Sequence, residues 1–92
     1  MKKKEYVMCD FEILEGEREY TESYYYPKER YDKLTTKEVL EEFFCTDLGE
    51  QFKANSYWDC DRVVGLDYTR NFKADEKQLK FLSSIGVWGQ QE

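Results

Sequence analysis

The stretch EYVMCDFEILEGEREYTESYYY, residues 5–26, decides the fold of this chain. Up to residue 14 its side chains alternate between two faces, with Val7, Cys9, Phe11 and Ile13 on one and Tyr6, Met8, Asp10 and Glu12 on the other. A period of two is typical of a half-buried strand. Glu15 and Gly16 then form a turn, since Gly tolerates positive φ, and a second strand rich in Tyr and Thr follows at 17–26. The pattern predicts an antiparallel hairpin.

The register of this hairpin stays open at the level of sequence. With Glu15 and Gly16 as the two loop residues, Glu12 would lie opposite Glu19, and like charges directly opposed are destabilising. The same register puts Glu22 opposite the apolar inner face. A bulge or a longer loop would relieve both conflicts.

Two helices and a third strand are expected after the hairpin. Pro27 ends the second strand, because it cannot donate to a ladder. Residues 35–38 match a capping box, and an apolar face follows at Val39, Leu40, Phe43 and Phe44. Residues 57–70 read as one bent strand or two short ones, with Gly65 marking a bulge or a close backbone contact. The third-strand face would hold Trp58, Cys60, Val64, Leu66 and Tyr68.

A second capping box at 75–78 starts the last helix, whose buried stripe would be Leu79, Leu82 and Ile85, with Gly86 at its C-cap. The predicted class is therefore α+β: a small antiparallel sheet in β-β-α-β-α order, with two helices packed on one face. The opposite face would be wet and partly acidic. Residues 1–92 would form a single compact domain, with flexible tails at 1–4 and 89–92.

Composition limits the possible functions. The chain has 92 residues, a net charge of −6, 17% aromatic residues and no histidine. The negative charge repels nucleic acid and favours basic protein surfaces. Cys9, Cys45 and Cys60 are odd in number and widely spaced, which is unlike a secreted disulfide scaffold. Since we find no signal peptide and no apolar run of membrane-spanning length, we expect a cytoplasmic protein with reduced thiols.

Sequence patterns typical of catalysis are missing. Without His, a metal site would need Cys and carboxylates, and the cluster Asp59-Cys60-Asp61 does not start a calcium loop, because Val63 stands where a ligand is needed and Gly65 comes one place late. A nucleophilic Cys needs a base or a positive neighbourhood, and no Gly-rich phosphate loop is present. We therefore predict a protein that is not an enzyme and that needs no metal and no cofactor.

Two surfaces could bind a partner. One is acidic and the other aromatic; their residues are Asp10, Glu12, Glu17 and Glu19, and Tyr24, Tyr25 and Tyr26. Spaced carboxylates can imitate a phosphate backbone, although they also serve as ordinary solubilising charge. Tyr is favoured at interfaces, although alternate tyrosines of a strand also pack on a core.

In size, acidity, aromatic content and lack of catalytic residues, the chain is similar to the small anti-CRISPR and antirestriction proteins of phages. This resemblance is one of general character and rests on no aligned residues. It implies an inhibitor that occupies a basic nucleic-acid-binding surface of a partner protein. The alternatives are a regulatory or assembly adaptor that docks through Tyr24 to Tyr26 and Trp88, and, less favoured, a small-ligand binder or enzyme.

Overall fold

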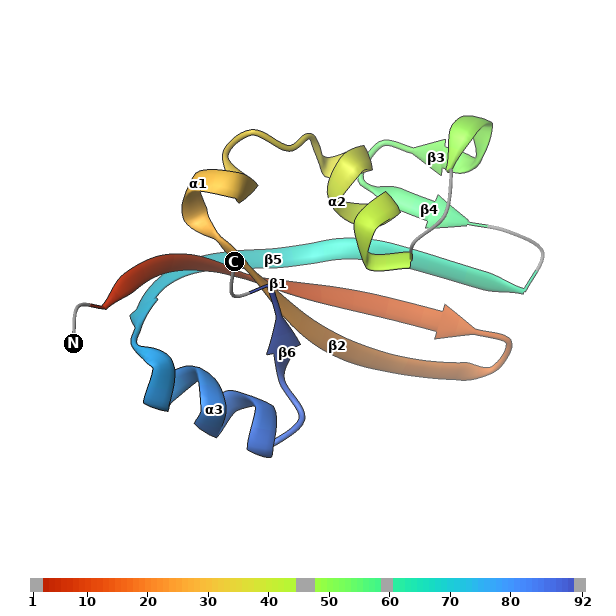
Figure 1. The fold of residues 1–92 in the computed structure, drawn as a ribbon. Helices are drawn as coiled ribbons and strands as arrows, with labels where there is room; N and C mark the ends of the chain where they lie inside the picture. The colour runs from red at the N-terminus through yellow and green to blue at the C-terminus, as the bar shows by residue number, and fades with distance from the viewer. Residues whose placement is uncertain (1–2, 45–47, 59–60, 91–92) are drawn as a thin grey trace.

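The computed structural model describes residues 3–44, 48–58 and 61–90 (Figure 1). Within these residues the chain forms one six-stranded sheet in the order β3-β4-β5-β1-β2-β6. The strands are β1 (Lys4–Glu15), β2 (Arg18–Pro27), β3 (Phe52–Lys53), β4 (Ser56–Trp58), β5 (Arg62–Ala74) and β6 (Trp88–Gly89). The helices are α1 (Lys28–Tyr31), α2 (Thr36–Phe44) and α3 (Glu76–Ser84), with a 3-10 turn η1 (Gly49–Gln51). The α+β class is confirmed, although the predicted order omitted α1, η1, β3 and β6.

The hairpin of β1 and β2 is antiparallel as predicted, with its loop one residue later. Glu15 pairs with Arg18, so Gly16 and Glu17 are the loop residues, and Gly16 has a φ of 62°. Each β1 residue therefore faces the β2 residue two positions beyond the one predicted. A shift of two keeps every side chain on its predicted face, because the side-chain period of a strand is two.

The observed register removes the conflict between carboxylates. Glu12 faces Thr21 rather than Glu19, and Glu22 faces Phe11 near the exposed edge of β2. The register that we considered from the sequence is thus wrong, and avoidance of like-charge pairs gives the physical reason.

The main core lies on one face of the sheet, which we call the upper face because it is uppermost in Figure 1. It is built around the β1 residues predicted to face inward, all of which are buried: Val7, Cys9, Phe11 and Ile13. From the apolar face of α2, Val39 and Leu40 are buried here, and the other buried members of the cluster are Tyr26, Leu48, Tyr57 and Val64. The upper face is therefore closed by α1, α2 and the β3–β4 hairpin.

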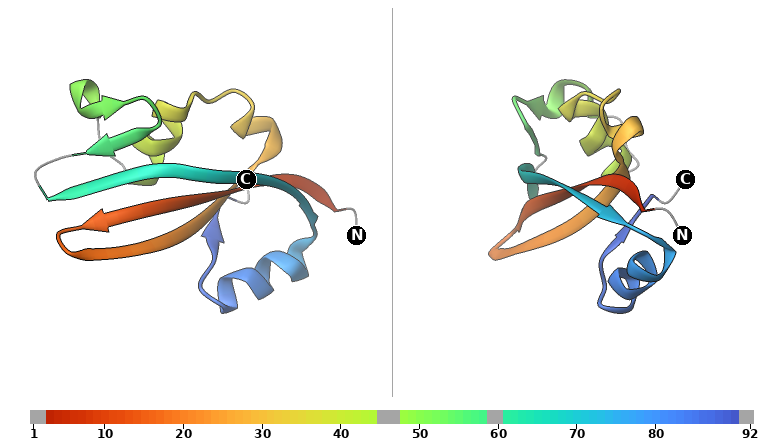
Figure 2. Two further views of the ribbon diagram at one scale, coloured as in Figure 1. Left: turned by 180° about the vertical axis from the view of Figure 1, so that it is seen from behind. Right: turned by 90° about the vertical axis from the view of Figure 1, so that its left-hand side faces the viewer.

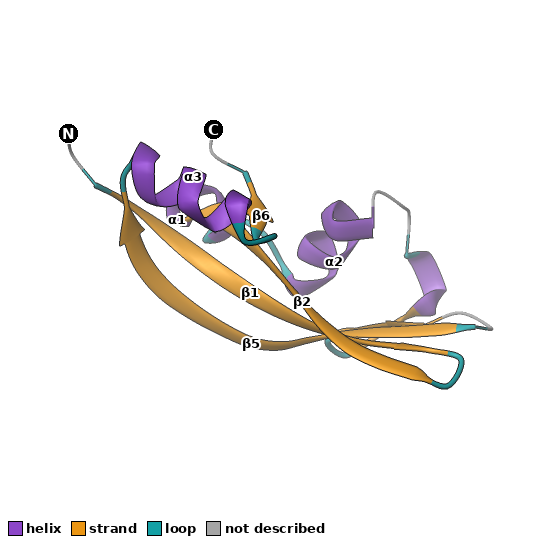
Figure 3. Cartoon of the chain, turned by 90° about the horizontal axis from the view of Figure 1, so that it is seen from below, coloured by secondary structure: helices purple, strands orange, loops and turns teal. Residues whose placement is uncertain are grey.

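The other face, here called the lower face, holds a second and smaller core between the sheet and α3 (Figures 2 and 3). Its buried members are Tyr6, Met8, Tyr25, Ala74 and Leu79. The prediction that both helices pack on one face is therefore wrong. The reason is visible in β1, where Tyr6 to Cys9 are apolar and buried on both faces, whereas Asp10 and Glu12 make the following part amphipathic.

The segment predicted as one bent or two short strands, 57–70, forms the end of β4 and the start of β5. One bulge in β5 changes the face on which the residues after it lie. The register of β5 against β1 shifts between Leu66 and Tyr68, which leaves Asp67 as the extra residue. Tyr68 consequently lies on the lower face, and not beside Val64 and Leu66 as predicted. Gly65 makes the expected close approach instead of the bulge: a Cβ there would lie 3.2 Å from Ser56 Oγ.

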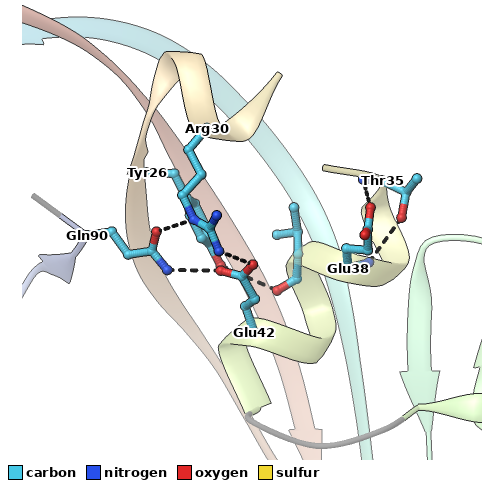
Figure 4. Close-up of polar contacts among 7 residues, drawn as sticks. Tyr26, Arg30, Thr35, Glu38, Glu42 and Gln90 are labelled. Atoms are coloured by element: carbon cyan, nitrogen blue, oxygen red, sulfur yellow. Dashed lines mark hydrogen bonds and ion pairs between the residues drawn. The ribbon is translucent and has the colours of Figure 1, made fainter. Parts of the chain in front are cut away.

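Local signals at the helix ends were read correctly. The backbone N–H of Thr35 donates to Glu38 at 2.8 Å, and that of Glu38 donates back to the Thr35 hydroxyl at 3.1 Å (Figure 4). Asp75 and Gln78 form the same capping box at the start of α3. Gly86, with φ of 88°, ends this helix, so Ile85 lies beyond the last turn and is exposed instead of buried.

The chain returns to the sheet at its end. Trp88 and Gly89 form β6 and pair in parallel with Tyr24 and Tyr25 of β2, so the sheet is not purely antiparallel. The Gln90 N–H donates to the Tyr25 carbonyl at 2.8 Å. Gly89 and Gln90 are therefore tied to the sheet, although we predicted a flexible tail from residue 89.

Among the described residues, no helix has the length and apolar character needed to span a membrane.

Candidate functional site

The half of the lower face that belongs to Asp10–Glu15 of β1 and its neighbours is covered by no helix or strand of the described chain (Figure 1). The pairing register sets side chains in rows across this half, because residues directly opposite each other share a face. One row runs Trp58–Val63–Leu14–Glu19 from β4 to β2, and the next runs Ser56–Gly65–Glu12–Thr21. A third row places Tyr68 beside Asp10 and Ser23. We call the exposed part of these rows the open face; its residues are Glu12, Leu14, Glu19, Thr21, Trp58, Val63 and Tyr68.

The open face presents large apolar groups to solvent. Trp58 is 45% exposed, Val63 40%, Leu14 42% and Tyr68 58%. Directly behind two of them, on the upper face, Ile13 and Val64 are 3% and 0% exposed. Because contiguous apolar side chains on a small protein mark an interaction surface more often than scattered ones do, this patch is the leading candidate for a binding site.

The four predicted acidic residues divide into two groups. The Asp10 carboxylate is satisfied: it accepts from the Ser23 hydroxyl at 2.7 Å and forms an ion pair with Arg70 at 2.7 Å. Glu12 and Glu19 lie within the open face, and Glu17 lies in the hairpin loop beside it; all three are exposed. No cation of the described residues forms an ion pair with any of them. The open face therefore combines an apolar row, Trp58–Val63–Leu14, with exposed carboxylates: Glu12 lies beside this row on the central strand β1, and Glu19 and Glu17 lie toward β2 and the loop.

The predicted tyrosine patch is not a surface. Tyr25 and Tyr26 are 0% exposed, and Tyr24 is half-buried against the upper core. The Tyr26 hydroxyl donates to the Val39 carbonyl at 3.3 Å, and the Tyr25 ring packs edge to face on Tyr6. Consecutive tyrosines of a strand point to opposite faces, and here both faces are covered. The expectation of docking through all three is therefore corrected.

A second exposed apolar group lies on α3, at the other end of the lower face. Phe81 on the helix is 63% exposed, and Ile85, the C-cap residue just after it, is 59% exposed. Lys77 and Lys80 share this outward side of the helix and are exposed. Trp88, 61% exposed, points the other way, because its partner Tyr24 belongs to the upper face.

Charges near the C-terminal segment serve the fold. Arg30 of α1 forms an ion pair with Glu42 of α2, and Gln90 bridges both: it accepts from Arg30 at 2.7 Å and donates to Glu42 at 2.9 Å (Figure 4). These three side chains join α1, α2 and the segment after β6. They are occupied with one another, so we do not include them in the candidate site.

The chemistry available in the described residues is limited. Burial raises the pKa of the Cys9 thiol to about 12, so this group is not a thiolate at neutral pH. The predictions for Cys45 and Cys60 fall outside the described residues. No group of three or more metal-ligating side chains gathers in the part of the chain that is described.

One hollow of about 920 Å³ lies between the start of β1 and α1, where Lys4, Lys28, Arg30 and Lys33 alternate with Glu5, Glu29 and Asp32. Lys28 pairs with Asp32 at 3.1 Å, and Arg30 is held by Glu42. The mixed and partly paired charges give this hollow no single ligand preference.

Comparison of the chain with protein-family models, with curated proteins and with solved structures finds no match.

Sequence reasoning identified the acidic part of the open face and missed its apolar part. Trp58 and Tyr68 had been assigned to an inner face together with Val64. No sequence signal distinguished Tyr68, because Val64, Leu66 and Tyr68 recur every two residues; the bulge at Asp67 moves Tyr68 to the other face. For Leu14, the signal was its place in the alternation: it follows Glu12 by two residues and therefore lies on the same face.

Proposed function

We propose that this protein is a non-enzymatic binding protein that uses the open face to occupy a basic surface of a partner protein. The observation that supports this most is the combination of exposed Trp58, Val63 and Leu14 with the carboxylates of Glu12 and Glu19, which form no ion pair with another described residue. Apolar groups contribute affinity on desolvation, and the carboxylates beside them select a positive partner and speed its approach.

The favoured class of partner is a nucleic-acid-binding protein, and the favoured role is inhibition. Such partners carry dense Lys and Arg to neutralise phosphates. The hairpin presents Glu12 on β1, Glu17 in the loop and Glu19 on β2, so it offers spaced negative charge to that kind of surface. The net charge of −6 acts in the same direction over longer distances.

An assembly adaptor is the second candidate, because aromatic side chains dominate binding energy at many interfaces. The exposure of Trp58 and Tyr68 supports it, and these two residues replace the Tyr24–Tyr26 run in that hypothesis. An adaptor that docks through aromatic groups would bind a partner with little dependence on salt.

Salt dependence separates the two candidates. The protein is immobilised, proteins of its native host are captured at low and at high ionic strength, and association rates of the captured partner are then measured. We expect association to slow strongly as salt rises, since screening acts on steering between exposed charges. A partner that associates equally fast at both salt concentrations would favour the adaptor and reject the inhibitor of a basic surface.

A further inference from the structure

The lower face carries two exposed apolar patches. Negative side chains lie beside one of them, and positive side chains lie beside the other. The open face combines Trp58, Val63 and Leu14 with Glu12 and Glu19. The outer side of α3, with the C-cap residue that follows it, combines Phe81 and Ile85 with Lys77 and Lys80. Both sets of charged side chains are exposed, and the salt bridges of the described residues involve none of them.

These two surfaces cannot meet within one chain. Helix α3 is fixed over Tyr6, Met8 and Tyr25 by its inner residue Leu79, so its outer side points away from the sheet (Figure 3). The open face lies farther along the same face of the same sheet, over the second half of β1. Complementary surfaces that are separated in this way can meet only between molecules.

We propose that the open face of one copy binds the outer side of α3 of a second copy, and that the two copies form a twofold-symmetric dimer. Turning one copy end to end places its α3 over the other copy's open face, and the same rotation makes the reciprocal contact. A twofold arrangement thus forms both contacts at once and closes the assembly at two copies.

The dimensions of the two elements agree with this arrangement. The nine residues of α3 make a helix about 14 Å long. The part of β1 beyond the cover of α3, Asp10 to Glu15, extends for about 20 Å. A second α3 therefore fits in the uncovered length, and the dimer would be two sheets with two helices between them.

The charges select this partner over a random apolar contact. In the dimer, Lys77 and Lys80 of one copy approach Glu12 and Glu19 of the other. Two copies with a charge of −6 each repel one another overall, so local attraction between these groups is needed to bring the faces together.

This inference uses the same open face as the proposed function, and it is tested on the purified chain alone, so either can fail without the other. A basic partner would compete with the second copy for Glu12 and Glu19. The self-association would then hold the open face covered until such a partner displaces it.

The test is the mass of the full chain in solution, measured by light scattering or sedimentation over a range of concentrations. We expect twice the chain mass of 11.2 kDa at the upper concentrations. The double variant Phe81→Gln/Ile85→Gln should raise the dimer dissociation constant by roughly tenfold or more, since truncated apolar anchors cost at least that much. The matched control Trp88→Gln changes a similarly exposed side chain that points to the upper face, and it should leave the mass unchanged.

A charge exchange provides the second arm. Glu12→Lys/Glu19→Lys and Lys77→Glu/Lys80→Glu should each weaken the dimer, and the two pairs combined in one chain should restore it. A monomer at every concentration would overturn the proposal. So would a dimer that resists both sets of changes, or a mass that keeps growing beyond two copies, which is the behaviour of a head-to-tail contact.

Discussion

Leu14 of β1 and Val63 of β5 face each other directly on the lower face, and both are about 40% exposed. Their neighbours Ile13 and Val64 form the equivalent pair on the upper face and are buried. One end of the sheet is thus a closed core on one side and a bare apolar surface on the other. An exposed apolar surface lowers the solubility of a protein unless a partner covers it, and we interpret this one as a binding site.

The first prediction compares the two neighbouring valines. Val64→Ala should lower the free energy of unfolding by about 2 kcal/mol, because it removes fully buried methyl groups and leaves a small cavity. Val63→Ala should cost less than about 0.5 kcal/mol in dilute protein, where the open face is wet. Urea unfolding of both variants at low protein concentration checks this. Equal losses would contradict the assignment of the two faces.

The second prediction concerns Gly89. A Cβ at this position would lie 2.3 Å from the Tyr25 ring, and Tyr25 is fully buried between Tyr6 and Phe72. Gly89→Ala should therefore displace β6 and cost about 1–3 kcal/mol in the free energy of unfolding, as overpacking does. Trp88→Gln, one residue earlier and exposed, serves as the control with little effect. If Gly89→Ala unfolds like the unchanged protein, β6 does not pack on Tyr25 as described.

The third prediction is a loss of stability at high pH. Burial raises the pKa of Cys9 from 9.0 to about 12, and it raises the pKa of Tyr26 well above its ordinary value of 10.0. The unfolded chain loses these protons first, so the full stability is present below about pH 9 and declines as pH rises toward 12. Tyr26→Phe should flatten this decline between pH 9 and 11, measured by urea unfolding. A control variant, Tyr68→Phe, changes an exposed ring and should decline as steeply as the unchanged protein.

Much of the fold could be predicted from local chemistry. The alternation in β1, the glycine at the hairpin turn and the two capping boxes each depend on a few neighbouring residues, and each was read correctly. The face of the sheet on which α3 packs could not be predicted from neighbouring residues. It depends on Tyr6 and Met8 being covered, and the sequence pattern of β1 assigned them to the wet face together with Asp10.

The candidate site likewise has a part that local sequence predicts and a part that depends on long-range contacts. The carboxylates of Glu12 and Glu19 could be placed on one face from the side-chain period alone. That Asp10 is paired with Arg70, and so is not part of the candidate site, depends on a contact between residues 60 positions apart. The burial of Tyr25 and Tyr26 depends on α3 from below and α2 from above. Such long-range packing decides which side chains stay exposed to solvent. Sequence periodicity carries no information about these contacts.

If the open face is the binding surface of this protein, the capture of partner proteins from the native host must depend on its charges, and matched charge variants measure this dependence. Glu12→Lys/Glu19→Lys reverses two carboxylates on the open face, and Glu29→Lys/Glu50→Lys makes the same change of net charge on α1 and η1, on the upper side. We expect the first variant to remain folded and to lose the captured partner, while the second retains it. Retention of the partner by the first variant, or equal loss by both, would contradict the account.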